Sequence, residues 1–428
     1  MTWLRLALAN LTLSPLTTAV NVLLMALGTA SIVLLLLAGV QLQDTMSRDA
    51  RGIDLVLGAQ GSPVQLILSA VYHADVAPGN ISLHDAERWA EDSRVANAIP
   101  MSLGDSFRGF RIVGTTTGYT ELYGAELATG ELWSEPMEAV LGSAVAQATG
   151  LTTEATFAGA HGLEDGGETH DDQVYRVVGV LEPTGTVLDR LVVTSLESVW
   201  DLHGEHEHAH ESEHEDEGHA HEEEADHHDD RDEHAHEEVG HDEEHAADLE
   251  ITAMLLTFRT PLAAATLPRD IKTEGTLQAA APAMEVSRVL QLVGVGVTAL
   301  SAFAWVLVAT AALSIFAALY GSMRARRGEH AMLRCLGATR SELLIYLIVE
   351  GLLMSALGVA LGFLVGHVMM ELVSAWLAST RGVIMTGWLW APGESMLLVG
   401  LIAVGGLSAI IPAVQAYRTD VARTLADA

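Results

Sequence analysis

The sequence predicts an α-helical membrane protein with four transmembrane helices and a large mixed α+β extracytoplasmic domain between the first and second helices. Two observations lead to this fold class. Half of the 428 residues are hydrophobic although the formal net charge is -34, and the apolar residues gather in four long stretches with the charged residues between them. The arginines then orient the chain, because basic residues concentrate in cytoplasmic loops.

The four stretches are residues 17–40, 290–320, 343–377 and 395–417. Each is long enough to cross a bilayer, which takes about 20 residues in a helix. The first is too long for the apolar region of a signal peptide and lacks a cleavage site of small residues, so we interpret it as a retained anchor. The second and third exceed one bilayer thickness, and we expect one end of each to project into water or the helix to tilt.

Orientation follows from the two basic segments. The link between the second and third stretches carries Arg324, Arg326, Arg327, Arg334 and Arg340. The C-terminal tail adds Arg418 and Arg423, whereas the loop between the third and fourth stretches has only Arg381. The link and the tail are therefore expected in the cytoplasm, together with the N-terminus, and the large region between the first two spans outside it.

These boundaries divide the chain into nine segments. The membrane part comprises an N-terminal interfacial helix with the first transmembrane helix (1–41), the second (289–320), a cytoplasmic coupling segment (321–342), the third helix (343–378), an extracytoplasmic loop (379–394), the fourth helix (395–417) and a cytoplasmic tail (418–428). The extracytoplasmic α+β domain covers 42–288, with a His- and acid-rich insertion at 203–245 that is expected to be disordered.

Local patterns predict the elements of the outer domain. Residues 82–95 have helical spacing after an N-cap-like serine, and residues 137–151 predict a short helix that ends at Gly150. The β-branched and aromatic runs at 107–116, 172–183 and 250–260 predict strands, and 189–202 predicts a strand followed by a short helix.

The insertion contains thirteen of the 19 histidines and 20 of the 56 acidic residues. Imidazoles two residues apart among carboxylates are ligands for zinc, and nickel, cobalt and copper(II) are equally compatible. The alternative is a solvated acidic spacer, which has no need of so many histidines. The candidate ligands are His206, His208, His210, His214, His219, His221, His227, His228, His234, His236, His241 and His245.

The link at 321–342 has the pattern of a short amphipathic helix, with Met332, Leu333 and Leu336 on one side and arginines on another. Such a helix can seat in a groove of a partner protein. The alternative is a basic loop that only fixes topology.

The chain resembles the FtsX/MacB-type permeases of ABC transporters. The resemblance is carried by "RARRGEHAMLRCLGATRSELLIYLIVEGLL", by the closing "IPAVQAYRTDVARTLA" and by "NLTLSPLTTAVNVLLMALGTA" near the start. It implies one span, an outer domain and three more spans, and a permease homodimer in which each copy is coupled to a separate ABC ATPase subunit. The resemblance also implies that the residues of this coupling are Arg326, Arg327, Glu329, Leu333, Arg334, Leu336, Gly337 and Arg340. The sequence has no G-x-x-x-x-G-K-[ST], so no nucleotide is expected in this chain.

The third span holds three further features. Gly358, Gly362 and Gly366 are spaced for close packing against another helix. Glu350 is expected to reach the interface or pair with an arginine, in preference to serving a relay. His367 and Glu371, four residues apart, are expected to pair with each other, in preference to holding a cation.

We therefore expect a permease subunit in a bacterial inner membrane, with its large domain in the periplasm and not itself an enzyme, since no H-E-x-x-H or nucleophile elbow is present. The histidines link it to divalent metal handling, with a periplasmic metal-binding or lipoprotein partner. The alternatives are a mechanotransmission complex that activates a periplasmic hydrolase and a lipoprotein-releasing permease unrelated to metal. The acidic balance argues against nucleic acid as a partner.

Overall fold

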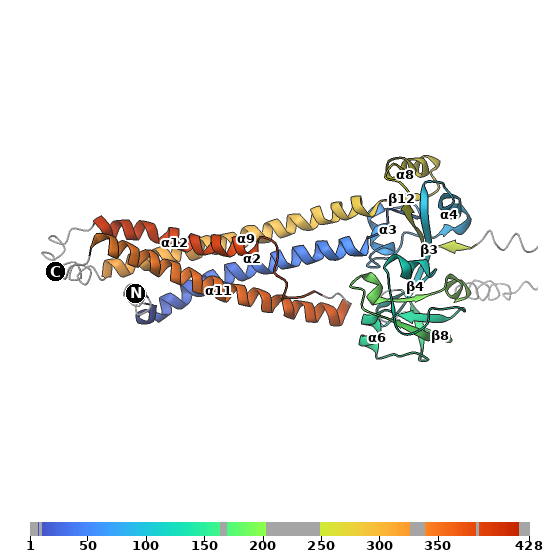
Figure 1. Cartoon of the computed structure of the whole chain (residues 1–428), viewed down its shortest axis with the longest axis horizontal. Coiled ribbons are helices and arrows are strands. Elements are labelled where there is room, and N and C mark those ends of the chain that lie inside the picture. The colour runs from blue at the N-terminus through green and yellow to red at the C-terminus, as the bar shows by residue number, and fades with distance from the viewer. Residues whose placement is uncertain are drawn as a thin grey trace, which may run out of the picture. The chain divides into compact units, whose positions relative to one another are not determined.

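The structure is a computed structural model, and it describes residue 7 and residues 11–162, 169–202, 249–325, 339–381 and 385–418 (Figure 1). The chain forms two compact units. The helical unit consists of Met1–Asp44 and Leu290–Ala428, and the α+β unit consists of Thr45–Val289. The large domain expected at 42–288 corresponds in position to the second of these.

Four helices in the described part of the chain are long and apolar enough to cross a membrane. They are α2 (Pro15–Asp49), α9 (Pro282–Ala325), α11 (Arg340–Arg381) and α12 (Glu394–Arg418). The prediction of one such helix before the large domain and three after it is confirmed. Both α2 and α9 are longer than the predicted spans, because their polar ends continue into the α+β unit, which begins at Thr45 and ends at Val289.

The helices of the helical unit share an apolar core to which all four contribute. Met25, Val308, Ile315, Leu347 and Leu401 are buried there. Large apolar side chains also cover the outside of the helices, and on α9 they include Val295, Leu300, Phe303, Trp305, Val306 and Leu313. Because this outer surface is as apolar as the core, the helices are suited to a lipid environment.

The α+β unit is built on a mixed ten-stranded sheet in the order β12-β1-β11-β3-β4-β9-β6-β8-β5, with β7 paired to β3 and β8. Its strands are β1 (Leu55–Gly58), β3 (Val95–Phe107), β4 (Phe110–Thr115), β5 (Leu127–Gly130), β6 (Glu138–Leu141), β7 (Thr156–His161), β8 (Thr169–Leu181), β9 (Leu191–Thr194), β11 (Ala253–Phe258) and β12 (Gln278–Ala280). The pairs β4–β9 and β6–β8 are parallel, and the others are antiparallel. A second sheet pairs β2 (Ile81–Ser82) with β10 (Glu250–Ile251).

Short helices cover this sheet and divide its core in two. They are α3 (Pro63–Ala70), α4 (Leu83–Ala90), α5 (Gly118–Leu122), α6 (Ser143–Thr149), the 3-10 helix η1 (Val187–Arg190) and α8 (Ala263–Glu274), and residues 196–202 are also helical. Figure 1 shows α4 and α8 at one end of the sheet and α6 beside β8 at the other. Accordingly, Trp89 and Ile271 lie in one apolar cluster and Val145 and Tyr175 in another.

Two of the local predictions are wrong in part. The helix expected over 82–95 ends at Ala90, and Val95 opens β3, where its side chain is buried. Of the helix expected over 137–151, only Ser143–Thr149 is helical, whereas Glu138–Leu141 forms the fully buried strand β6. A short apolar run fits a buried strand as well as a helix, and here the neighbours β8 and β9 decide. Gly150 closes α6 in the left-handed conformation, as expected.

Candidate functional site

The last turn of α2 is held in the α+β unit by the side chain of Asp49. Only 1% of Asp49 is exposed. Its Oδ1 accepts the backbone N–H of Val187 at 2.7 Å, and its Oδ2 lies 3.4 Å from Nη2 of Arg190. The same Arg190 nitrogen donates to the carbonyl of Tyr72 at 3.2 Å. The buried carboxylate therefore links the helix end to η1, and Arg190 extends this link to the segment after α3.

Two tyrosines hold the backbone of this helix end. The hydroxyl of Tyr72 donates to the carbonyl of Met46 at 3.1 Å, and that of Tyr123 donates to the carbonyl of Asp49 at 2.6 Å. The last carbonyls of a helix have no partner within it, so these bonds satisfy groups that would otherwise need water. We call Asp49, Tyr72, Tyr123, Val187 and Arg190 the α2 joint. Burial raises the pKa of Tyr72 above its usual 10, so this hydroxyl keeps its proton.

Tyr119 and His73 extend the polar surroundings of the joint. The Tyr119 ring contacts that of Tyr123 edge-on, with centroids 5.4 Å apart, and its hydroxyl lies 3.0 Å from Nε2 of His73. Burial, together with the nearby Arg111 and Arg190, holds the pKa of His73 well below 6.5. This histidine is therefore neutral and does not add a positive charge to those of Arg111 and Arg190.

The three glycines of the third span lie against α2. A Cβ atom on Gly358 would stand 2.6 Å from Cβ of Met25, and one on Gly366 would stand 3.0 Å from Cβ of Val33. On Gly362 it would come within 2.4 Å of the carbonyl oxygen of Ala26. The absence of side chains at these positions allows α2 and α11 to approach each other closely.

A second close approach joins α11 to α12, and sequence reasoning missed it. A Cβ on Gly351 would lie 2.7 Å from Cβ of Ala409, and Gly405 leaves room for Ser355, whose hydroxyl donates to the carbonyl of Ile402 at 3.2 Å. The signal in the sequence was the pair Gly405 and Gly406 within an apolar stretch. Asn21 of α2 also links three of the helices. It accepts a hydrogen bond from Ser314 of α9 at 2.5 Å and contacts the sulfur of Met354 of α11.

His367 does not pair with Glu371, which corrects the expectation from their spacing. Its Nε2 lies 2.8 Å from Oε1 of Glu394, and its Nδ1 donates to the carbonyl of Gly387. Glu371 instead accepts the N–H of Gly387 at 2.7 Å. Both side chains thus hold the chain between α11 and α12. No group of three or more potential metal ligands is found among the described residues, whether here or in the α+β unit.

Glu350 lies inside the helical unit with only 2% of its surface exposed. The expected reach to the membrane interface is therefore wrong. A carboxylate placed among packed helices is normally satisfied by other protein groups.

Arg340 is the one proposed coupling residue that the structure describes, since 326–338 lie outside the described residues. It begins α11, and its guanidinium lies 6.0 Å from the ring centroid of Tyr417. Thr339 and Glu342 form a reciprocal cap there: Thr339 Oγ1 accepts the Glu342 N–H at 3.3 Å, and Glu342 Oε2 accepts the Thr339 N–H at 2.7 Å. The last three residues of the predicted coupling segment, 340–342, thus already belong to the capped first turn of α11. The twelve candidate metal ligands between 206 and 245 also lie outside the described residues.

Two parts of the chain match models of known protein families. The model of the MacB-like periplasmic core domain matches residues 18–216, and that of the FtsX-like permease C-terminal domain matches residues 301–421. A search of curated proteins found no match.

Solved structures similar to the chain include a periplasmic region and an extracellular domain. The periplasmic region of MacB from Actinobacillus actinomycetemcomitans has 12% sequence identity and a TM-score of 0.32, and the match covers 56% of this chain and 95% of that one. The extracellular domain of the ABC-type transporter YknZ from Gram-positive bacteria has 11% identity and a TM-score of 0.29, with 53% of this chain and 98% of that one covered.

Proposed function

This chain belongs to the FtsX/MacB-type permeases of ABC transporters, and from that premise we propose that it passes motion, driven by ATP hydrolysis in a separate ATPase chain, to its α+β unit. The chain itself is a permease subunit. The absence of a phosphate-binding loop from its sequence supports a division of labour in which the partner hydrolyses ATP.

The α2 joint is the observation that carries this proposal. A moving helix can do work on a domain only if its end is fixed to that domain. Asp49 fixes the end of α2 through Val187 and Arg190, while Tyr72 and Tyr123 fix its last carbonyls. Bonds to a buried carboxylate resist displacement better than exposed ones, because water cannot replace the partners that are lost. A displacement of α2 would therefore reach η1 and the segment after α3.

The input to this motion is proposed to enter at 321–342, where a partner ATPase would receive the apolar side formed by Met332, Leu333 and Leu336. The capped start of α11 supports this role. Because Thr339 and Glu342 bond each other's backbone N–H groups, α11 begins at a fixed residue, Arg340, within the C-terminal end of the segment. Motion of the segment would thus pass into the helix whose glycines contact α2.

Co-purification tests the coupling. We expect the double substitution Leu333→Asp and Leu336→Asp to release the ATPase from purified membranes, because an unpaired charge buried in an interface costs several kcal/mol. Ser341→Asp is the matched control, since it adds a carboxylate to the same segment at an exposed position in the first turn of α11, where a negative charge is favourable, and should retain the partner. If the double variant inserts normally and still retains its ATPase, the segment only fixes topology and the coupling role is refuted.

We further propose, from the sequence, that the His- and acid-rich segment at 203–245 binds divalent metal, with zinc as the first candidate and nickel, cobalt or copper(II) as the others. A permease homodimer and a periplasmic metal-binding or lipoprotein partner complete the proposed assembly in the bacterial inner membrane. Mechanotransmission to a periplasmic hydrolase is the second candidate function, because the α2 joint would serve it equally.

A further inference from the structure

In the chain between α11 and α12, backbone N–H and carbonyl groups form hydrogen bonds with side chains of the helices. Met385 exchanges hydrogen bonds with Ser374, donating its N–H to Oγ at 3.2 Å and accepting the hydroxyl proton at its carbonyl. Thr386 likewise exchanges hydrogen bonds with Gln41 of α2. Its N–H donates to Oε1 at 2.7 Å, and its carbonyl accepts a hydrogen bond from Nε2 at 3.0 Å. Two consecutive residues thus have both backbone polar groups satisfied without water.

The next residues follow the same pattern. Gly387 donates to Glu371 at 2.7 Å and accepts from His367 at its carbonyl, and Ala391 donates to Oε2 of Glu394 at 3.0 Å. A Cβ on Gly387 would stand 2.3 Å from the carbonyl oxygen of His367, so only glycine lets the loop lie this close to α11. Residues 385–393, which we call the α11–α12 loop, are therefore tied to helices at several points. Irregular backbone of this kind is compatible with membrane depth, where unsatisfied groups cost several kcal/mol.

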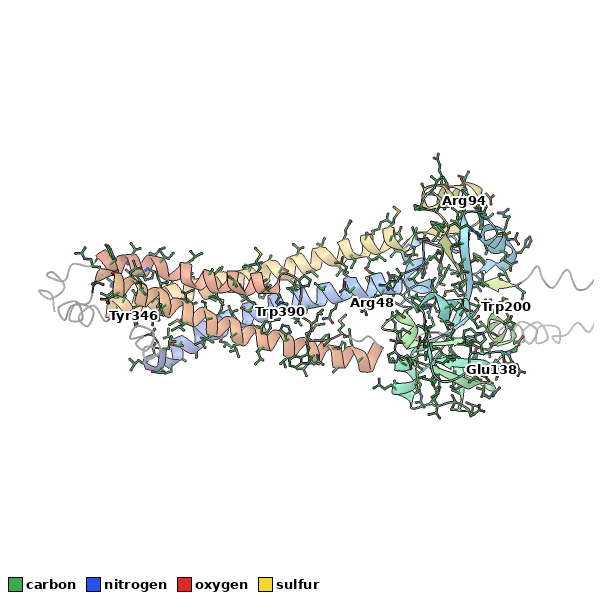
Figure 2. The ribbon with its side chains drawn as sticks, in the orientation of Figure 1. Arg48, Arg94, Glu138, Trp200, Tyr346 and Trp390 are labelled. Carbon is green, nitrogen blue, oxygen red and sulfur yellow. The ribbon has the colours of Figure 1, made fainter. Side chains whose placement is uncertain are left out.

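The outward side of this loop is aromatic. Trp388 is 82% exposed and Trp390 is 58% exposed, whereas Ala391 is fully buried with Val33, Leu37 and Met370. Trp390 is labelled in Figure 2. The loop therefore has an inner side that is buried and hydrogen-bonded and an outer side that exposes two large apolar rings. Exposure of such rings to water is unfavourable.

Exposed apolar side chains continue from the loop along both neighbouring helices. On α11 they are Leu361, Leu364, Val365, Val368, Leu372 and Trp376, whose positions follow the helical repeat and therefore lie on one face. On α12 the exposed residues Met396, Val399, Leu407 and Ile410 lie on one face in the same way, at intervals of three and eight residues. These are the faces that a membrane-crossing helix turns to lipid, so the indoles lie at the end of a lipid-facing surface.

The length of α12 places the loop at the edge of the bilayer. Its 25 residues, Glu394–Arg418, extend about 37 Å at 1.5 Å per residue, which exceeds a hydrocarbon core of about 30 Å by a few ångströms at each end. Tyr417 lies at one end of the helix and Trp390 just before the other. Tryptophan and tyrosine are enriched at these two levels, where the ring is in contact with acyl chains and the polar atom with water.

We propose that the α11–α12 loop is an interfacial anchor, in which Trp388 and Trp390 insert into the boundary between headgroups and acyl chains of the outer leaflet. The partner is the lipid and not a protein, because the aromatic surface is continuous with the lipid-facing faces of α11 and α12. His367, Glu394 and Gln41 set the depth of the indoles by holding the loop on the helices. The anchor would hold the extracytoplasmic end of the helical unit at a constant depth in the membrane.

Tryptophan quenching tests the anchor in the full chain, reconstituted in dioleoylphosphatidylcholine vesicles or in their analogue brominated at acyl carbons 9 and 10. We expect Trp388→Phe with Trp390→Phe to lose a large part of the emission that the brominated lipid quenches. The matched control is Trp133→Phe with Trp200→Phe in the α+β unit, which removes two indoles and should lose none of it.

A second quencher separates lipid from water. Acrylamide, which stays in the aqueous phase, should quench the emission lost in the Trp388/Trp390 variant much less than it quenches N-acetyltryptophanamide, a water-exposed indole, in the same buffer. The proposal is overturned if both variants lose the same bromolipid-quenchable emission, or if acrylamide quenches the Trp388 and Trp390 emission fully. Either result places the indoles in water, where a protein partner would have to cover them.

Discussion

Asp49 and Arg190, 141 positions apart in the chain, meet with Oδ2 of the carboxylate 3.4 Å from Nη2 of the guanidinium. Asp49 is the last residue of α2 and Arg190 the last of η1, so the pair joins a membrane-spanning helix to the 3-10 helix that precedes β9. The carboxylate is almost completely buried, and 19% of the Arg190 side chain is exposed. The pair is therefore placed to resist relative movement of the two elements.

Asp49→Ala should destabilise the α+β unit by about 3 kcal/mol, because it leaves a largely buried guanidinium without its carboxylate and the Val187 N–H without its acceptor. Asp49→Asn should cost less, since its amide oxygen can still accept the Val187 bond. Urea unfolding of the full chain in detergent, followed by tryptophan emission, measures both. Equal stability of wild type and the alanine variant would exclude a supporting role for the joint.

Gly362→Ala should loosen the packing of α2 against α11 at a cost of about 1–3 kcal/mol, because the added Cβ would lie 2.4 Å from the Ala26 carbonyl oxygen. Gly400→Ala is the control, since nothing lies within 4 Å of the Cβ added there. Thermal unfolding in detergent compares the two. A Gly362 variant as stable as the Gly400 variant would contradict the close approach.

Glu394→Gln should preserve the contact with His367, whereas Glu394→Ala should lose it. The Gly387 carbonyl can only accept, so Nδ1 of His367 carries a proton, and the 2.8 Å contact at Nε2 then holds one more proton shared with Glu394. A glutamine side chain can supply that proton while its oxygen accepts from Ala391. A double-mutant cycle with His367→Ala should give a coupling energy of about 1–3 kcal/mol, and a coupling near zero would show that the two residues act independently.

Acid should weaken the α+β unit partly through Asp92. Two hydrogen bonds from the Arg94 guanidinium, at 2.9 and 2.8 Å, lower the pKa of Asp92 from 3.8 to about 2. Because the folded pKa is the lower one, this stabilisation is complete above pH 3.8 and is lost as the pH falls through about 2.

We therefore expect Asp92→Asn to lower the unfolding free energy by about 1 kcal/mol at pH 5, a value that allows for the partial exposure and screening of the pair. The effect should be much smaller at pH 2, where Asp92 takes up its proton in the folded protein. Arg94→Gln should abolish the same pH dependence. Urea unfolding at a series of pH values measures these differences, and a constant difference between wild type and Asp92→Asn across that range would rule out the assigned role.

Deletion of residues 203–245 should remove most of the zinc-binding capacity of the full chain and leave the α+β unit folded. Binding should weaken below roughly pH 6, as imidazoles take up protons. Calorimetry with zinc chloride measures the number of ions bound, with circular dichroism as the control for folding. Equal zinc uptake by wild type and the deletion variant would refute the metal proposal.

The sequence by itself determined the elements that depend only on residues close together in the chain. The four membrane-capable helices follow from runs of apolar residues longer than a bilayer requires, and the glycines at 358, 362 and 366 mark a surface for close packing whatever helix covers it. The strand at 172–183 follows from its β-branched and aromatic content, and β8 confirms it. None of these depends on a distant part of the chain.

Tertiary structure decided everything that depends on which distant groups meet. His367 had Glu371 at helical spacing, yet it bonds Glu394 and Gly387, whose acceptor groups are supplied by α12 and by the loop before it. Residues 138–141 form a strand because β8 and β9 lie on either side. Asp49 gains its function from Tyr72, Tyr123, Val187 and Arg190, whose hydrogen bonds form only when the sheet brings these segments together. Spacing along the chain encodes local geometry, whereas a buried carboxylate takes its partners from the fold.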